Sequence, residues 1–401
     1  MHNKATIQSI TSKIIQDSRG KPTISVTVSS QNESASFDVP SGASTGAREV
    51  SIKNPHDVSD IIQDIILPRL LNVSVHSQKA IDDALHELGE THALDSIGGN
   101  TALGISVAAS KLAAIEQGQE TWEYIRDLFG SKTQASNPRL FVNLINGGAH
   151  ATVGSDIQEH QIIPDTDNIE IALETTTKIQ NNLATILHSN YLESDIGIGD
   201  EGGYMIPSTS TIEPFELLMD AIAHSAPEIK VFLGIDAAAN SFYENGSYNL
   251  NGSKLTKEQL LKTYQQLRRD FPNFQMIEDP FSEDDLTAFS EFRDSCPNTL
   301  TIGDDLTTTS KASLAQAIQA NAINGIIIKP NQIGTVSRTL ETMKLAYEHN
   351  VKCIVSHRSG ETMDSFIADL AYGTKCYGLK AGAPSMQERA VKYKRLIEIA
   401  D

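Results

Sequence analysis

Cysteine is scarce in this chain, and long apolar runs are missing from it. Its 401 residues include three cysteines, Cys296, Cys353 and Cys376, which are too few and too scattered for a disulfide framework or a zinc site. No apolar stretch approaches the length that spans a bilayer, and residues 1–5 lack the apolar segment of a signal peptide. These absences favour a cytoplasmic protein, while additional display at a cell surface stays open.

Positive charge is also in short supply. Asp and Glu number 51 against 32 Lys and Arg, a formal net charge of −19. This balance argues against nucleic-acid binding, because phosphate backbones need clustered cations. It also argues against long-range steering of an anionic substrate, so any such substrate requires cations placed locally.

The length predicts more than one core. A hydrophobic content of 39% with 21% charged residues is typical of a globular protein, and 401 residues exceed one ordinary domain. Strand-like alternation over residues 4–30, with a turn at 17–22, predicts a hairpin. Helical spacing follows, with Val58, Ile61, Ile62, Ile65 and Ile66 expected on one face. We predict an α+β domain at residues 1–130 and, after a polar linker, a second domain at 139–401.

Short apolar runs recur through the second domain. Eight of them read as strands separated by helical segments, which predicts a β/α barrel. The carboxyl ends of parallel barrel strands converge on one mouth, so the charged groups found there indicate an active site. The charged residues that end these runs, or lie close behind them, are Asp236, Glu278, Asp304, Lys329, His357 and Lys380.

Three of these strand ends carry carboxylates. Asp236, Glu278 and Asp304 offer hard oxygen ligands without thiolates, a set that favours Mg²⁺, although single acidic residues there also cap helices. Beside such a metal, Lys329 can be held neutral and act as a general base. A phosphate anchor or a solvated side chain remain alternatives for Lys329 and for Lys380.

Other segments add candidate groups. Glycines surround Glu201 in a run too rich in glycine for a packed strand, so we expect a loop that presents its carboxyl group, and Glu159 is a candidate partner. Arg358 and Ser359 form an ordinary phosphate-binding pair, with a surface ion pair as the alternative for the arginine. Residues 41–46 are small and predict either a lid with oxygen ligands or a flexible turn. The residue type alone leaves the role of His150 open.

Together these segments resemble the enolase family nearly from end to end. The motifs that carry the resemblance are Asp17-Ser18-Arg19-Gly20, Ser41 to Gly46, Gly199 to Gly203, Lys329 to Gly334, Ser356 to Thr362 and Ala381-Gly382-Ala383-Pro384. The resemblance implies an α/β fold in which an enolase-type barrel beginning ββαα, its second strand antiparallel, follows an α+β domain. It also implies a lyase of glycolysis and gluconeogenesis, a homodimer or larger homo-oligomer, that reversibly dehydrates 2-phospho-D-glycerate to phosphoenolpyruvate.

The resemblance also implies residue roles. Asp236, Glu278 and Asp304 would bind one Mg²⁺, and Ser44 a second. Lys329 would remove the proton alpha to the carboxylate, and Glu201, supported by Glu159, would protonate the departing hydroxide. The residues expected at the phospho-acid substrate are Lys380, Arg358, Ser359, His150, His357 and Gln158.

The chain departs from the family pattern at three places. Residues 47–57 differ from the usual Glu-rich stretch, His160 and Gln161 replace an apolar pair, and Gln16 replaces a leucine. A paralogue acting on another phospho- or phosphonocarboxylate, or a non-catalytic surface-binding homologue, therefore stays as an alternative.

Overall fold

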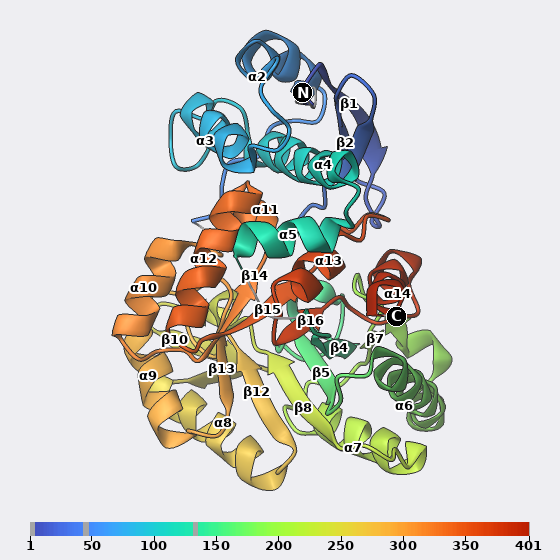
Figure 1. Ribbon diagram of the computed structural model, residues 1–401. Helices are drawn as coiled ribbons and strands as arrows, with labels where there is room; N and C mark the ends of the chain where they lie inside the picture. Colours follow the sequence, from blue (N-terminus) through green and yellow to red (C-terminus); the bar gives the residue numbers. More distant parts are fainter. Residues whose placement is uncertain (1–4, 43–47, 131–134, 401) are drawn as a thin grey trace.

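The computed structural model describes residues 5–42, 48–130 and 135–400 (Figure 1). Its first part contains an antiparallel sheet of β1 (Ser9–Gln16), β2 (Pro22–Ser29) and β3 (Ser34–Asp38), and the predicted hairpin joins β1 to β2. The helices that follow are α1 (Val58–Ile61), the π-helix η1 (Ile62–Ile66), α2 (Leu67–Leu70), α3 (Gln78–Leu88), α4 (Gly99–Gln117) and α5 (Thr121–Phe129). The long helix α4 covers β2 and β3 closely, because a Cβ at Gly104 would collide with Val26.

One expectation for these helices was wrong. Val58, Ile62 and Ile66 are fully buried, but Ile65 is 40% exposed. The chain forms a π turn at residues 62–66, in which positions four apart stay on the core side and the residue before Ile66 turns toward solvent. A buried face based on α-helical spacing therefore includes one residue too many.

A closed eight-stranded barrel forms the second part. Its strands, in spatial order, are β4 (Arg139–Asn146), β5 (Glu159–Pro164), β8 (Val231–Asp236), β12 (Phe274–Glu278), β13 (Leu300–Gly303), β14 (Gly325–Ile328), β15 (Lys352–Ser356) and β16 (Gly378–Lys380). β16 pairs with β4 and closes the ring. β5 runs antiparallel to both neighbours, β4 and β8, which confirms the predicted ββαα beginning.

Helices surround this barrel (Figure 1). They are α6 (Ile169–Asn190), α7 (Glu213–Ser225), α8 (Lys257–Asp270), α9 (Leu286–Ser295), α10 (Lys311–Gln319), α11 (Pro330–Ile333), α12 (Val336–Glu348), α13 (Phe366–Gly373) and α14 (Gln387–Ala400), with short 3-10 turns η2 (Gly148–His150), η3 (Glu193–Asp195) and η4 (Ala239–Phe242). The first part lies on the barrel through α4 and α5, which contact α11, α12 and α13. No helix in the described ranges is both long and apolar enough to cross a membrane.

The glycine-rich segment corrects a second expectation. It is not wholly a loop, because β6 (Gly197–Ile198) and β7 (Tyr204–Met205) form a small hairpin, and β7 pairs with β4. Glu201 lies in the turn of this hairpin. A second small sheet, β9 (Tyr243–Glu244), β10 (Ser247–Leu250) and β11 (Ser253–Leu255), contains two tight turns with positive φ, as the Asn-Gly pairs predicted.

Candidate active site

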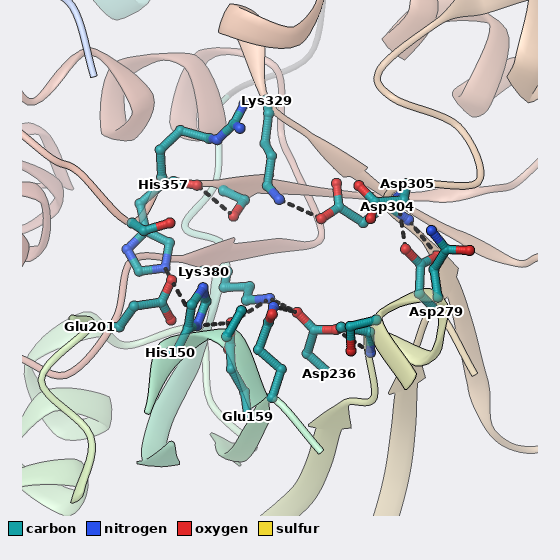
Figure 2. A pocket seen from close by; sticks show the side chains of 18 of the residues that line it. His150, Glu159, Glu201, Asp236, Asp279, Asp304, Asp305, Lys329, His357 and Lys380 are labelled. Atoms are coloured by element: carbon teal, nitrogen blue, oxygen red, sulfur yellow. Dashed lines mark hydrogen bonds and ion pairs between the residues drawn. The ribbon is translucent and has the colours of Figure 1, made fainter. Parts of the chain in front are cut away.

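A cavity of about 320 Å³ lies at the mouth of the barrel (Figure 2). Its lining includes strand ends, the β6–β7 turn and Glu49. Ser44 lies outside the described residues, and Glu278 does not line the cavity itself. The predicted residues that line it are His150, Gln158, Glu159, Glu201, Asp236, Asp304, Lys329, His357, Arg358, Ser359 and Lys380.

Lys380, at the end of β16, is the centre of a buried ionic cluster. Its Nζ lies 3.1 Å from Glu159 Oε1, 3.1 Å from Asp236 Oδ2 and 2.8 Å from Glu278 Oε2. Burial alone would lower the pKa of Lys380, but these carboxylates raise it well above its usual value. The pKa of Glu278 is nevertheless raised by burial and by Asp236. One ammonium group therefore does not neutralise the cluster.

Lys329 forms an ion pair with Asp304 on the neighbouring strand end. Its backbone is extended, as expected for a residue before proline, and its N–H donates to Thr309 Oγ1 at 2.9 Å. Gln332 Nε2 donates to the other oxygen of Asp304 at 3.2 Å. Burial opposes the charged lysine, but Asp304 outweighs it and raises the pKa of Lys329 above its ordinary value.

Glu159 and Glu201 lie close to two histidines, His150 and His357, on one side of the cavity. His150 Nδ1 lies 3.7 Å from Glu159 Oε1 and 3.6 Å from Glu201 Oε1, and the ligand atoms of these three residues lie within 4.8 Å of one another. Burial and the charge of Glu201 raise the pKa of Glu159 well above its usual range. Burial would also raise the pKa of Glu201, but His150 and His357 outweigh burial and hold it well below. Within this coupled pair, the surroundings favour the protonated form at Glu159 and the charged form at Glu201.

Sequence reasoning missed Arg389, a fully buried residue of α14. Its Nη1 lies 2.6 Å from His357 Nδ1, and its Nη2 donates to the carbonyl groups of Asp200 and Ser359. Burial lowers the pKa of His357 to about 4, so the ring is neutral. Its Nε2 faces Glu201 Oε1 at 3.2 Å. An arginine on an amphipathic helix gives no sequence signal of such a position.

Glu49 was also missed. Its carboxylate pairs with Arg358, with Arg358 Nη1 at 3.1 Å from Glu49 Oε2, and Arg358 Nη1 also donates to Asn331 Oδ1 at 3.0 Å. Both partners of the ion pair are buried, so the alternative of a surface ion pair for Arg358 is wrong. The signal was weak because Glu49 belongs to the segment that departs from the family pattern.

Asp304 also belongs to a second compact cluster of acidic residues, together with Asp279 and Asp305. Oxygen atoms of Asp279, Asp304 and Asp305 lie within 4.8 Å of one another, so the three can hold a metal ion. Asp279 accepts the backbone N–H groups of Asp304 and Asp305 at 2.9 and 2.7 Å. Burial and Asp304 raise the pKa of Asp305 to about 7. Of the predicted ligands Asp236, Glu278 and Asp304, only Asp304 belongs to this set, and the position of Asp279 and Asp305 directly after predicted ligands was the available signal.

Figure 2 shows how these groups divide the cavity. Glu201, His150 and His357 gather on one side, and Asp279, Asp304 and Asp305 on the other. Lys380 and Lys329 lie between these two groups. Gln158 Nε2 donates to Asp236 Oδ2 at 3.1 Å, so this predicted substrate residue contacts a predicted metal ligand.

Comparison with known proteins agrees with this arrangement. Residues 7–125 match the model described as Enolase, N-terminal domain, and residues 134–401 match the one described as Enolase, C-terminal TIM barrel domain. A protein named Enolase from Sulfolobus acidocaldarius is 38% identical over 406 residues, covering 100% of this chain and 96% of the relative. Enolase from Metallosphaera sedula is 37% identical over 408 residues, covering 100% and 97%. The chain belongs to the enolase family.

Proposed function

We propose that this chain is a lyase that reversibly dehydrates 2-phospho-D-glycerate to phosphoenolpyruvate, acting as a cytoplasmic homo-oligomer. The observation that carries the proposal is the shared cavity, in which the partly buried amine of Lys329 and the buried Glu159–Glu201 pair come from different walls. Abstraction of a proton beside a carboxylate and loss of hydroxide need a base and an acid placed in this way.

The acidic residues support a metal requirement. Glu278 Oε1 is buried and has no hydrogen-bond partner in the part of the chain that the structure describes, and Lys380 leaves the cluster incompletely neutralised. Carboxylate oxygens fit Mg²⁺, which we propose is held by Asp236, Glu278 and Asp304, with Ser44 at a second ion. Bound Mg²⁺ would supply Lewis-acid stabilisation of the negative charge that develops on the substrate carboxylate.

Lys329 is the proposed base. Asp304 stabilises the protonated form of Lys329. The neutral amine would therefore form only when the charge of Asp304 is bound to a cation instead. The nearby charges of Arg358 and Lys380 lower the pKa of Lys329 and so favour the neutral amine. With Asp304 engaged by a cation, these charges would let Lys329 abstract a proton near neutral pH.

Glu201 is the proposed acid, with Glu159 holding the proton in the free enzyme. The two carboxyl groups interact closely enough to exchange that proton, so a hydroxyl group beside Glu201 can leave as water. Lys380 would bind the substrate carboxylate, and Arg358 and Ser359 the phosphate. His150, His357 and Gln158 would contact the remaining polar groups.

The positions of His160 and Gln161, which follow Glu159, favour 2-phospho-D-glycerate over the substrate of a paralogue. His160 and Gln161 do not line the cavity. His160 packs instead against Phe215 of α7, with ring centroids 5.6 Å apart. Neither residue therefore changes the surface that a substrate would meet.

A direct assay tests the proposal. Purified chain with Mg²⁺ and 2-phosphoglycerate should raise ultraviolet absorbance as the enol forms, EDTA should stop the rise, and excess Mg²⁺ should restore it. A panel of other phospho- and phosphonocarboxylates should react more slowly. No absorbance change with 2-phosphoglycerate would refute the proposal, and faster turnover of another acid would favour the paralogue.

A further inference from the structure

Gln161 lies inside the barrel, directly under the proposed acid pair. Residues of a strand alternate between its faces, so on β5 Glu159 and Gln161 point into the barrel while His160 points to the helices. Gln161 is fully buried, and its Nε2 donates to Glu159 Oε2 at 2.7 Å. The contact therefore places an amide donor on the side of the carboxyl group that faces away from the cavity.

Because of this contact, the two oxygens of Glu159 have different partners. Oε2 accepts from Gln161, and Oε1 lies 3.1 Å from Lys380 Nζ and 3.7 Å from His150 Nδ1. If the donor were removed, a buried carboxylate oxygen would lose its partner, which is unfavourable, and the carboxyl group would be free to rotate. Gln161 thus keeps one defined oxygen directed toward the cavity.

A matching contact holds the second acid. Asn143 of β4 donates from Nδ2 to Glu201 Oε2 at 3.1 Å. Asn143 and Gln161 are direct partners in the β4–β5 ladder, so two carboxamides lie side by side beneath the two carboxyl groups. The arrangement is a built feature of the barrel interior, because both amide residues are fully buried.

We infer that Gln161 is a positioning residue that orients Glu159 for the dehydration. The inference rests on the proposed function and extends it to a side chain that touches no substrate. The Gln161 donor comes from the barrel interior and leaves Glu159 Oε1 to face Lys380 and His150.

Substitution of Gln161 by methionine tests the inference in the full-length chain with Mg²⁺ and 2-phosphoglycerate. Methionine keeps the volume and is apolar, so we expect the fold to tolerate it. We expect kcat to fall by about 10-fold or more, in the range found for residues that orient catalytic groups, with KM within about twofold. The control is His160→Phe, which changes the neighbouring buried side chain on the opposite face of β5 and should leave kcat unchanged.

A double-mutant cycle separates positioning from general damage. With Glu159 replaced by leucine, Gln161→Met should reduce the residual kcat no further, whereas independent structural effects would add. Equal kcat values for Gln161→Met and the unsubstituted chain would overturn this inference alone. Additive losses in the cycle, or a KM that rises along with the fall in kcat, would also overturn it. An inactive unsubstituted chain would instead overturn the proposed function, and this inference with it.

Discussion

Arg389 Nη1 lies 2.6 Å from His357 Nδ1, and this contact fixes the tautomer of the histidine. A guanidinium group has only donors, so Nδ1 of the neutral ring must accept and the ring proton must lie on Nε2. The protonated nitrogen, Nε2, lies 3.2 Å from Glu201 Oε1. The last helix of the chain thereby controls the side of the cavity that holds the acid pair.

We expect Arg389→Met to lower the stability of the protein and to change the tautomer of His357. The substitution removes the guanidinium hydrogen bonds to the carbonyl groups of Asp200 and Ser359, at about 1.5–3 kcal/mol each in the free energy of unfolding measured in urea. The ¹⁵N signals of His357 should change from the single Nε2–H tautomer to a mixture. Arg395→Met, on the same helix but at a partly exposed ion pair with Asp369, should leave those signals unchanged. An unaltered tautomer in Arg389→Met would contradict the assignment.

Lys329→Ala should abolish most activity without preventing folding. Loss of a general base lowers kcat by about 10²–10⁴-fold, measured in the Mg²⁺-dependent assay. Lys352→Ala is the matched control, because Lys352 is an exposed lysine at the opposite end of the neighbouring strand β15. Normal turnover by Lys329→Ala would show that the base lies elsewhere.

His160 should make stability depend on pH. Burial lowers its pKa to about 4, whereas an unfolded histidine titrates near ~6.5. Between these values the unfolded state binds more protons, so the free energy of unfolding should decrease as pH falls, by about 3 kcal/mol in all. His160→Phe should flatten this dependence in urea unfolding between pH 7 and pH 4.

The same variant should be more stable even at pH 7. Neither ring nitrogen of His160 has a hydrogen bond of ordinary geometry among the described residues, although the Ile145 backbone lies near the ring, and burial of such groups costs about 1–3 kcal/mol. A lower urea midpoint for His160→Phe at pH 7 would show that the ring is paired after all.

Glu278→Gln should weaken the stabilisation by Mg²⁺. Without metal, burial and Asp236 make the charged form of Glu278 unfavourable, so the amide should raise the melting temperature. The unsubstituted chain should gain about 2.7 kcal/mol when Mg²⁺ is at 100 times its dissociation constant, and the variant much less. Equal gains in both proteins would exclude Glu278 as a ligand.

The sequence was most informative where a local pattern decides the structure. Apolar runs predicted all eight barrel strands, and the charged residues that follow them meet at one mouth because parallel strands end on the same side. The two tight turns predicted from Asn-Gly pairs were also confirmed, because this residue pair determines the local backbone conformation. Ile65 was placed wrongly, since a π turn leaves no clear trace in an apolar pattern.

Contacts between distant segments were not predictable in this way. Arg389 reaches the site from the last helix, and Glu49 from the first part of the chain, through side-chain geometry that periodicity does not encode. Gln161 was noticed only as a departure from the family pattern. Its contact with Glu159 became visible once the inward face of β5 was known.

The reversed direction of β5 has a consequence for how substrate preference can change. Because β4 ends and β5 begins at the catalytic rim, the connection at residues 147–158 starts and finishes there, and it carries His150 and Gln158. A parallel neighbour would have to return from the far end of the barrel. This single short connection can therefore lengthen, shorten or exchange side chains over the reaction chamber while every strand keeps its register, which makes it a natural place to engineer a new acid specificity.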